Sequence, residues 1–403
     1  MIYLDAASTT PVRREAIEAM FPFLTNQFGN PSSHHELGEL AAQALAQARE
    51  RCAAVLGVHA QELVFTSGGT EGDNMALKGL ALARRAANPA LNQVVISAVE
   101  HPAIVESARY LDRVHGFEVL QLPVNAAGEV SAQDFAALLG LTGGGPAPQG
   151  RGSVAVASVM YANNEVGTVQ DIAALARLAA QAQVPLHSDA VQAAGWLPLQ
   201  PRRLGVAALT LSGHKIGAPK GSGLLYLRAG TACEPLIHGG GQERGARSGT
   251  PNVAFAVALA TALELAEQER TEAAQRVAAQ RDEFTAWVLR HIPGAVRTGH
   301  ARARLPGVAS FCFPGTSGES LLLELERRGI VCSSGSACAA GSDEPSPVLT
   351  AMGMERSVAQ TALRLSFNSS VTAAELAAAG RELAAAVQSV QRFKAAPQQH
   401  QGQ

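Results

Sequence analysis

The sequence has no strong excess of charge of either sign. Lysine and arginine together number 32, aspartate and glutamate 34, and the formal net charge of the 403 residues is −2. Proteins that mainly cover nucleic acid or an anionic membrane surface usually carry a large positive charge. No apolar run approaches the roughly 18 residues of a membrane-spanning helix, and the N-terminus lacks the basic and apolar pattern of a signal segment. We expect a cytoplasmic protein with no direct nucleic-acid partner and no membrane partner.

Cysteine and lysine are scarce. The five cysteines, an odd number, are scattered along the chain: Cys52, Cys233, Cys312, Cys332 and Cys338. This usage fits a reducing compartment better than a framework of disulfides. No second pair of cysteines or histidines at zinc spacing accompanies Cys332 and Cys338, so we expect no metal site. Only four of the 32 cations are lysines, which makes a lysine within a glycine-rich motif stand out.

Apolar β-like runs alternate with helical patterns, such as 71–87 and 171–183, through much of the chain. The runs cover 63–69, 93–102, 153–167, 184–192, 207–215 and 221–228. This order predicts an α/β fold with a mostly parallel sheet between layers of helices. Ligands of such folds bind at the carboxyl ends of the strands. The predicted strand ends carry the polar motifs SGGTEG, EHPA, NNEVGT, SDAVQ and SGHKIG.

A second, smaller α+β domain is predicted after a long alanine-rich helix at about 251–292. Its expected elements are strands near 307–315 and 362–367 and helices near 317–329 and 373–393. We expect a large domain over residues 12–262 and a small domain over 263–403, with residues 1–11 packing on the small one. The glycine- and proline-rich stretch at 142–150 predicts a flexible loop, and residues 394–403 predict a disordered tail.

Lys215 and Asp189 suggest a cofactor site. Lys215 lies in SGHKIG after an apolar run, and burial among small residues would lower its pKa and free the amine to form a Schiff base. A phosphate-binding or exposed loop lysine is the alternative. Asp189 ends the preceding apolar run, where a carboxylate could keep the pyridine nitrogen of pyridoxal phosphate protonated. A polar residue at a strand end can also be a helix N-cap.

Two further motifs suit the same cofactor. SGGTEG is a glycine-rich turn that opens a helix, and its N–H groups suit a phosphate, although such turns also serve as simple caps. His101 follows a strand, where an imidazole could stack on an aromatic ring or transfer a proton, although a lone histidine is often structural.

Cys338 differs from the other cysteines in its surroundings. It lies in a run of small and polar residues, SSGSACAAGS, whereas Cys312 lies in the apolar run SFCF. An accessible thiolate on such a loop could act as a nucleophile. An incidental loop cysteine is the alternative.

Ten short motifs follow one another along nearly the whole chain: YLDAASTTP, FGNPSS, SGGTEGDN, EHPA, NNEVGT, HSDAVQ, SGHKIGAPKG, GGGQERGARSGTPN, SSGSAC and RLSF. In this order they resemble the cysteine desulfurases, pyridoxal-phosphate enzymes of the class V aminotransferase group. The resemblance implies the fold-type I architecture. The SSGSAC loop with EPSPVL after it is similar to the group with the longer active-site loop, which supplies sulfur for iron–sulfur clusters and thiolated molecules.

The resemblance also implies a role for each matching residue. Lys215 would carry the cofactor, Asp189 would contact its pyridine nitrogen and His101 would stack on its ring. The other cofactor-binding residues would be Gly69, Thr70, Asn163, Gln192, Ser212, His214 and Thr250. Gln192 would lie near the phenolic oxygen, and Thr250 would reach the phosphate of the partner subunit of a homodimer. The substrate carboxylate would be held by Asn30, Asn163 and Arg364.

The implied reaction converts L-cysteine to L-alanine and leaves the sulfur on Cys338 as a persulfide, with Lys215 and His101 as the other catalytic residues. A sulfur-acceptor protein such as an iron–sulfur scaffold would follow, for cluster assembly and tRNA thiolation, and a transient contact of Cys338 with a cluster fits this role. Two alternatives stay open: a selenocysteine lyase or another class V enzyme, and a non-enzymatic scaffold that binds a cluster through Cys332 and Cys338.

Overall fold

The computed structural model describes residues 1–141, 153–334 and 344–395. The predicted loop at 142–150 lies outside these ranges, as do Cys338 with most of its loop and all but the first two residues of the predicted tail.

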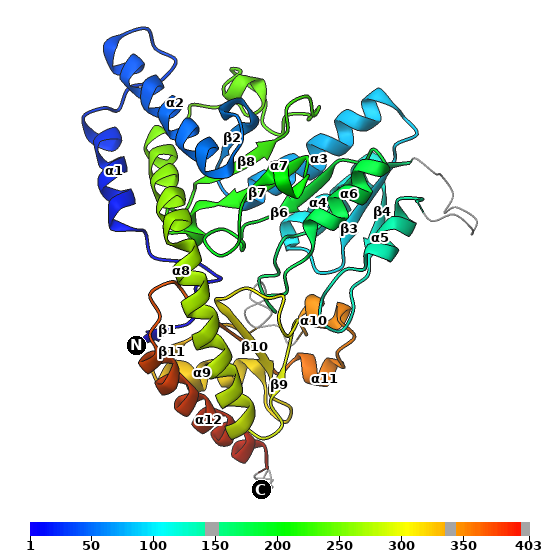
Figure 1. Ribbon diagram of the computed structural model, residues 1–403, viewed down its shortest axis with the longest axis vertical. Helices are drawn as coiled ribbons and strands as arrows, with labels where there is room; N and C mark the ends of the chain where they lie inside the picture. The colour runs from blue at the N-terminus through cyan, green and yellow to red at the C-terminus, as the bar shows by residue number, and fades with distance from the viewer. Residues whose placement is uncertain (142–152, 335–343, 396–403) are drawn as a thin grey trace, which may run out of the picture.

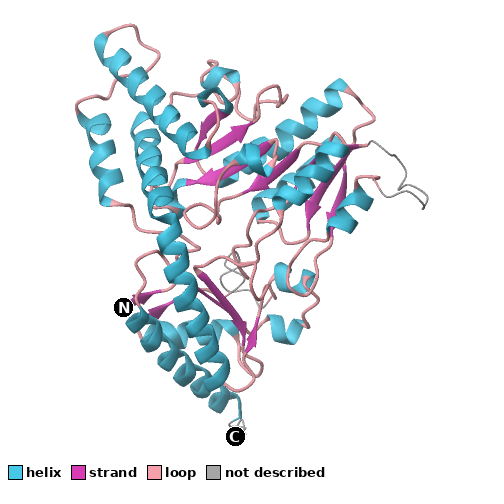
Figure 2. Cartoon of the chain, viewed as in Figure 1, coloured by secondary structure: helices cyan, strands magenta, loops and turns pink. Residues whose placement is uncertain are grey.

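The larger sheet has seven strands in the order β2-β8-β7-β6-β5-β3-β4 (Figures 1 and 2). Their bounds are β2 Leu63–Thr66, β3 Gln93–Ser97, β4 Glu118–Leu122, β5 Val154–Ser158, β6 Leu186–Asp189, β7 Ala208–Ser212 and β8 Gly223–Leu227. The neighbouring strands are parallel except where β8 pairs with β2 and β7. The predicted α/β fold with a mostly parallel sheet is confirmed. Six of these strands lie within the predicted runs and are shorter than them, mainly because the polar motif that closes a run forms a loop or begins a helix; the edge strand β4 was not predicted.

Helices cover both faces of this sheet. One face packs against α3 (Gly69–Ala87) and α4 (Pro102–His115), in an apolar cluster that includes Met75, Leu80 and Ile104. The other face packs against α2 (Glu36–Leu56), α5 (Ala132–Leu138), α6 (Ile172–Gln181) and the first part of α8 (Val253–His291). Because successive strand residues point to opposite faces, a strand covered on both sides buries every side chain, as β5 and β7 do.

The 39-residue helix α8 connects the two halves of the molecule (Figure 1). Its first part packs against α1 (Arg14–Thr25) and α2, and Ala266 still belongs to the core of the large half. Val277, Phe284 and Val288 of its second part belong to a second core with α12 (Ala373–Ala395). The long predicted helix is confirmed. The predicted domain boundary at 262/263 lies within it and stays a prediction.

The small half contains two short sheets. One has the antiparallel order β12-β10-β9, and in the other the N-terminal strand β1 pairs in parallel with β11. The N-terminal segment therefore lies against the C-terminal part of the chain. The bounds are β1 Ile2–Tyr3, β9 Val296–Arg297, β10 Val308–Cys312, β11 Ile330–Val331, β12 Ala362–Ser366, α9 Gly318–Arg327, α10 Pro347–Ala351 and α11 Arg356–Ala359.

Four short helical turns complete the described structure: α7 Pro201–Leu204, η1 Ala60–Glu62, η2 Gly213–Lys215 and η3 Glu243–Gly245. In the part of the chain that the structure describes, none of the helices combines the length and the apolar character needed to cross a membrane.

Candidate active site

Five of the sequence motifs meet at the carboxyl edge of the large sheet, as the parallel strand order predicts. The predicted site residues at this edge are Gly69 and Thr70 after β2, His101 after β3, Asn163 after β5, Asp189 at the end of β6, and Ser212, His214 and Lys215 at the end of β7. Arg364 comes from β12 of the small half. The site therefore lies between the two halves.

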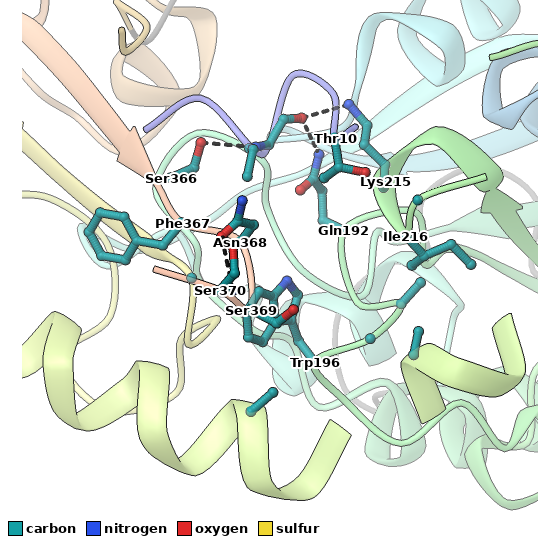
Figure 3. A pocket seen from close by; sticks show the side chains of 18 of the residues that line it. Thr10, Gln192, Trp196, Lys215, Ile216, Ser366, Phe367, Asn368, Ser369 and Ser370 are labelled. Atoms are coloured by element: carbon teal, nitrogen blue, oxygen red, sulfur yellow. Dashed lines mark hydrogen bonds between the residues drawn. The ribbon is translucent and has the colours of Figure 1, made fainter. Parts of the chain in front are cut away.

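Lys215 is half-buried and hydrogen-bonded to the N-terminal segment. Its Nζ donates to the carbonyl oxygens of Ala7 and Ser8 at 2.6 and 2.7 Å. Gln192 Nε2 donates to the same Ala7 oxygen at 3.0 Å, and Figure 3 shows both side chains directed toward it. Burial, followed by the charge of Arg364, lowers the pKa of Lys215 to about 8. This lysine therefore holds far more free amine at neutral pH than an exposed one, as covalent bonding to an aldehyde requires.

Asp189 is a buried carboxylate with few partners. It is 5% exposed, and its Oδ1 accepts one hydrogen bond, from the N–H of Val191 at 2.8 Å. Burial raises its pKa, whereas the charges of His101 and Lys215 lower it. The described residues provide it with no ion pair. A buried carboxylate in this state gains free energy from a protonated nitrogen placed beside it.

His101 is fixed by the helix that follows it. It is the N-cap of α4, and its Nδ1 accepts the N–H of Ala103 at 3.1 Å. Because Nδ1 is an acceptor, the neutral ring carries its proton on Nε2. Burial lowers the pKa of His101, as does the charge of Lys215, while the charge of Asp189 raises it. The ring therefore has one orientation and one free N–H, which suits either stacking or proton transfer.

The first turn of α3 forms a cradle with the end of β7. Gly68 has φ +156°, a conformation that glycine adopts without strain. A Cβ on Gly69 would lie 2.8 Å from Val191 Cγ2 and 3.4 Å from Ser212 Cβ. The first N–H groups of a helix have no acceptor within it and favour an anion. Thr70 is exposed in the same turn, and His214 Nδ1 lies 3.1 Å from Thr9 Oγ1. Burial, then the charges of Lys215 and Lys220, lowers the pKa of His214 to about 4.

Arg364 is almost fully buried and partly free to bind. Its Nη2 donates to Asp5 Oδ1 and Ser8 Oγ, both at 2.8 Å, and its Nη1 donates to the carbonyl of Asn164 at 3.0 Å. Among the described residues, its buried Nε has no hydrogen-bond partner. A guanidinium has five N–H donors, so the Nε–H and one Nη1–H are left, and these two point in different directions. The arginine therefore offers a single carboxylate its charge and one donor rather than its whole fork.

The remaining predicted residues are placed differently. Asn163 is buried, and all the described contacts of its side chain are with the protein: Nδ2 donates to Val99 and Met160, and Oδ1 accepts from the N–H groups of Glu165 and Val166. Asn30 is exposed between α1 and α2, where its Oδ1 accepts the N–H of Ser32. Thr250 is exposed on the segment between β8 and α8. Cys338 lies outside the described residues.

A cavity of about 270 Å³ opens beside Lys215, between the N-terminal segment, α8 and the end of β12. Figure 3 shows the labelled side chains around it, with Gln192 and Lys215 on one side and Asn368 and Ser370 on another.

Asp5 and Ser8 are site residues without a predicted role, although both belong to the motif YLDAASTTP. Both side chains bind Arg364, from which they are 359 and 356 positions away in the sequence. Motif spacing within the sequence cannot predict a contact over such a separation. Their only sign of a functional role in the sequence is that an acid and a hydroxyl residue occur in one of the ten motifs.

Comparisons with known proteins show the family of this chain. The model of the class-V aminotransferase family matches residues 2–378. The IscS-like cysteine desulfurase of Mycobacterium tuberculosis is 44% identical over 393 residues, which cover 97% of this chain and 98% of that protein. This chain belongs to the class-V aminotransferase family and, within it, to the cysteine desulfurases. The cysteine desulfurase NifS of Azotobacter vinelandii is 42% identical, over 95% of this chain and 91% of that protein.

Solved structures show the same relationship. A NifS-like protein superposes with a TM-score of 0.87 at 33% identity, covering 96% of this chain and 99% of that one. A structure described as SspA in complex with cysteine has a TM-score of 0.76 at 32% identity, covering 91% and 99%. The predicted resemblance to the cysteine desulfurases and the fold-type I architecture are confirmed.

Members of this family use pyridoxal phosphate, and the residues present fit that group. The cradle of Gly68, Gly69 and Ser212 suits its phosphate, since a Cβ on Gly69 would close the approach. The buried carboxylate of Asp189 suits a protonated pyridine nitrogen, and the amine of Lys215 suits its aldehyde.

Proposed function

We propose that this protein is a pyridoxal-phosphate-dependent cysteine desulfurase that converts L-cysteine to L-alanine and transfers the sulfur to Cys338. One observation carries the proposal: Lys215 Nζ and Arg364 Nη2 donate to the carbonyl and hydroxyl oxygens of the same residue, Ser8, at 2.7 and 2.8 Å, and the buried carboxylate of Asp189 lies at the same edge of the sheet. An amine, an acid and a carboxylate-binding arginine are the protein groups that amino-acid chemistry with this cofactor needs.

Each of these residues has a defined task. Pyridoxal phosphate, when bound, supplies an electron sink for negative charge at the α-carbon of an amino acid. Asp189 would supply the negative charge for a protonated ring nitrogen, and the cradle residues would hold the phosphate. Arg364 would bind the substrate carboxylate through its positive charge and one N–H that the protein leaves unused. Lys215, with a pKa of about 8, takes up and returns a proton near neutral pH.

The sulfur step is assigned to Cys338. Its thiolate would attack the substrate sulfur, a sulfur–sulfur bond would form, and the bond between sulfur and the β-carbon would break with its electron pair going to carbon. Proton transfer to the carbon fragment, with His101 as the nearby imidazole, would complete alanine. Among the described cysteines, burial raises the pKa to about 11 for Cys312 and to about 12 for Cys52, Cys233 and Cys332. These four thiols stay protonated at neutral pH and are poor nucleophiles.

A homodimer is part of the proposal. Large apolar side chains are 37–68% exposed between residues 17 and 40, a pattern typical of an interface; they are Ile17, Phe21, Leu24, Phe28, Leu37 and Leu40. Thr250 is exposed as well, which supports the proposal that it reaches a phosphate in the partner subunit. The segment that carries it is joined to the cradle helix through an ion pair of 2.9 Å between Arg247 and Glu71.

The sulfur is proposed to pass from Cys338 to an acceptor protein such as an iron–sulfur scaffold, for cluster assembly and for tRNA thiolation. A reducing compartment, the cytoplasm, suits this chemistry, and the four described cysteines are free thiols.

An absorbance spectrum followed by product analysis tests the proposal. The purified protein should be yellow, and L-cysteine should yield alanine and, with a thiol reductant, sulfide. The variant Lys215→Ala should lack a borohydride-reducible bond to the cofactor and should form no alanine. A colourless wild-type protein that leaves L-cysteine unchanged would favour a scaffold instead, and a strong preference for L-selenocysteine would favour the lyase.

A further inference from the structure

Three residues of the sequence motifs have no task in the proposed reaction, yet they converge beneath Asp189. Asp73 comes from α3, Glu100 from the connection between β3 and α4, and His187 from β6, two positions before Asp189. Side chains two positions apart on a strand point to the same face. His187 and Asp189 therefore both point toward the face that α3 covers.

Hydroxyl groups connect these residues into a row across neighbouring strands. His187 Nδ1 lies 2.9 Å from Ser158 Oγ of β5, and His187 Nε2 lies 2.9 Å from Thr210 Oγ1 of β7. The Ser158 hydroxyl lies beside Glu100 and the Thr210 hydroxyl beside Asp73. We call Glu100, Ser158, His187, Thr210 and Asp73 the buried polar row. Ser158, His187 and Thr210 are 0% exposed, Asp73 1% and Glu100 5%.

Glu100 has one satisfied oxygen and one free oxygen. Its Oε1 accepts the Ser97 hydroxyl at 2.6 Å and the N–H of Met160 at 2.7 Å. Its Oε2 is buried and has no hydrogen-bond partner in the part of the chain that the structure describes. A buried carboxylate oxygen without a donor is costly, whereas a protonated oxygen is itself a donor and can use the Ser158 hydroxyl as its acceptor.

The charges around the row favour a single carboxylate, on Asp189. Lys215 of η2 and His101 at the start of α4 lower the pKa of Asp189, but neither contributes to that of Glu100 or Asp73. Burial raises the pKa of Glu100 to about 8, helped by the charge of Asp189 and opposed by the hydrogen-bond donors of Ser97, Met160 and Ser158. Burial and the charge of Asp189 also raise the pKa of Asp73, against the hydrogen-bond donor of Thr210. Burial lowers the pKa of His187 to about 3, so this ring is neutral and offers no compensating charge. Several unpaired negative charges in one buried region repel each other.

We propose that Glu100 is a positioning residue that stays protonated at neutral pH, donates through Oε2 into the buried polar row, and so leaves Asp189 as the carboxylate that faces the cofactor. The inference rests on the proposed function, because only a bound pyridine ring needs the charge on Asp189. Proton positions follow along the row: Glu100 donates to Ser158, Ser158 to His187 Nδ1, and His187 Nε2 to Thr210. A second charge at Glu100 would compete with Asp189 for the ring proton.

Infrared spectroscopy of the holoenzyme tests the protonation state directly. Protonated carboxyl groups absorb apart from carboxylates, and labelling with carbon-13 glutamate identifies glutamate bands. At pH 7 the wild type should show a protonated glutamate band that disappears with a midpoint near pH 8. The band should be absent from Glu100→Gln and present in the control Glu106→Gln, whose side chain is 64% exposed. The same band in Glu100→Gln, or no such band in the wild type, would overturn the inference.

The cofactor spectrum provides a second readout. Glutamine keeps both acceptor contacts of Oε1 and can donate to Ser158, so Glu100→Gln should fold and be yellow at pH 7. The wild-type absorbance should change as Glu100 ionises near pH 8, and this change should be missing in Glu100→Gln. An alkaline change that persists in the variant would contradict the proposed effect on Asp189. If the proposed function were wrong, the protein would be colourless or would form no alanine from L-cysteine, while the infrared comparison would still report the proton on Glu100.

Discussion

Replacing Asp5 by asparagine should strengthen substrate binding, although Asp5 forms an ion pair with the arginine of the site. Its Oδ1 accepts both Arg364 Nη2 and the Ser8 hydroxyl at 2.8 Å, and an asparagine Oδ1 can accept the same two hydrogen bonds. The substitution therefore removes a charge and keeps the geometry. A substrate carboxylate on the free donors of Arg364 would no longer be repelled by a neighbouring carboxylate.

The size of the effect follows from distance and exposure. Two carboxylates on one guanidinium lie roughly 6 Å apart, and at an effective dielectric constant of about 20 they repel by ~3 kcal/mol. The Asp5 side chain is 18% exposed, so solvent reduces this to about 1 kcal/mol. The KM for L-cysteine should fall roughly fivefold. The pKa of Lys215 should fall below about 8, because the charge of Asp5 raises it. Stability should decrease by about 1–3 kcal/mol, since Arg364 loses its counter-charge.

Alanine formation at varied L-cysteine concentration and pH measures both effects. Asp5→Ala is the informative companion, because it removes the acceptor as well and should raise KM by releasing Arg364. The control is Asp282→Asn, which removes the ion pair between Arg281 and Asp282 away from the site. The side chain of Asp282 is 66% exposed. An unchanged or higher KM in Asp5→Asn, with Arg364 still in place, would refute the electrostatic reasoning.

Four further outcomes are expected. In cofactor-free protein the free energy of unfolding should rise from about pH 8 to 10.5 by at most roughly 1.4 kcal/mol per pH unit, because the folded chain releases the Lys215 proton near 8 and the unfolded chain near 10.5. Urea titrations should show that Lys215→Met lacks this part of the rise. The same dependence of unfolding free energy on pH in both proteins would contradict the lowered pKa of Lys215. Ser212→Ala should weaken cofactor binding about tenfold in equilibrium dialysis, because a hydroxyl of the phosphate cradle is lost, and unchanged affinity would remove Ser212 from it. Cys332→Ala should remain active in alanine assays, since burial keeps this thiol protonated with a pKa of about 12, and inactivity would give it a role that its burial disfavours. Phe21→Glu should sediment as a monomer and lose cofactor, because the partner's phosphate site would lack Thr250; an active monomer would remove the shared site.

Much of the architecture was predictable because buried parallel strands leave a clear signal. Strands covered on both faces are continuous apolar runs, and β5 and β7 bury every residue. The motif that follows each run then lies at the carboxyl edge whatever the order of the strands. This is why Lys215, Asp189 and His101 could be placed in one site before the fold was known.

The parts that were not predicted depend on long-range pairing. The antiparallel direction of β8 is invisible in its apolar run, because both directions bury the same side chains. The contact of Asp5 with Arg364 joins opposite ends of the chain. Glu100 lies next to His101 in the same motif, but its free oxygen becomes apparent only once β5 and β6 are placed beside it.

Mass spectrometry of the protein after reaction with L-cysteine tests the central claim most directly. One additional sulfur should be found on Cys338, in step with one alanine released. In Cys338→Ala the cofactor spectrum should still respond to L-cysteine, because Lys215, Asp189 and Arg364 are unchanged, while the persulfide and the alanine should be lost. Added sulfur on Cys332 or Cys312, or alanine released by Cys338→Ala at the wild-type rate, would contradict the proposed sulfur transfer.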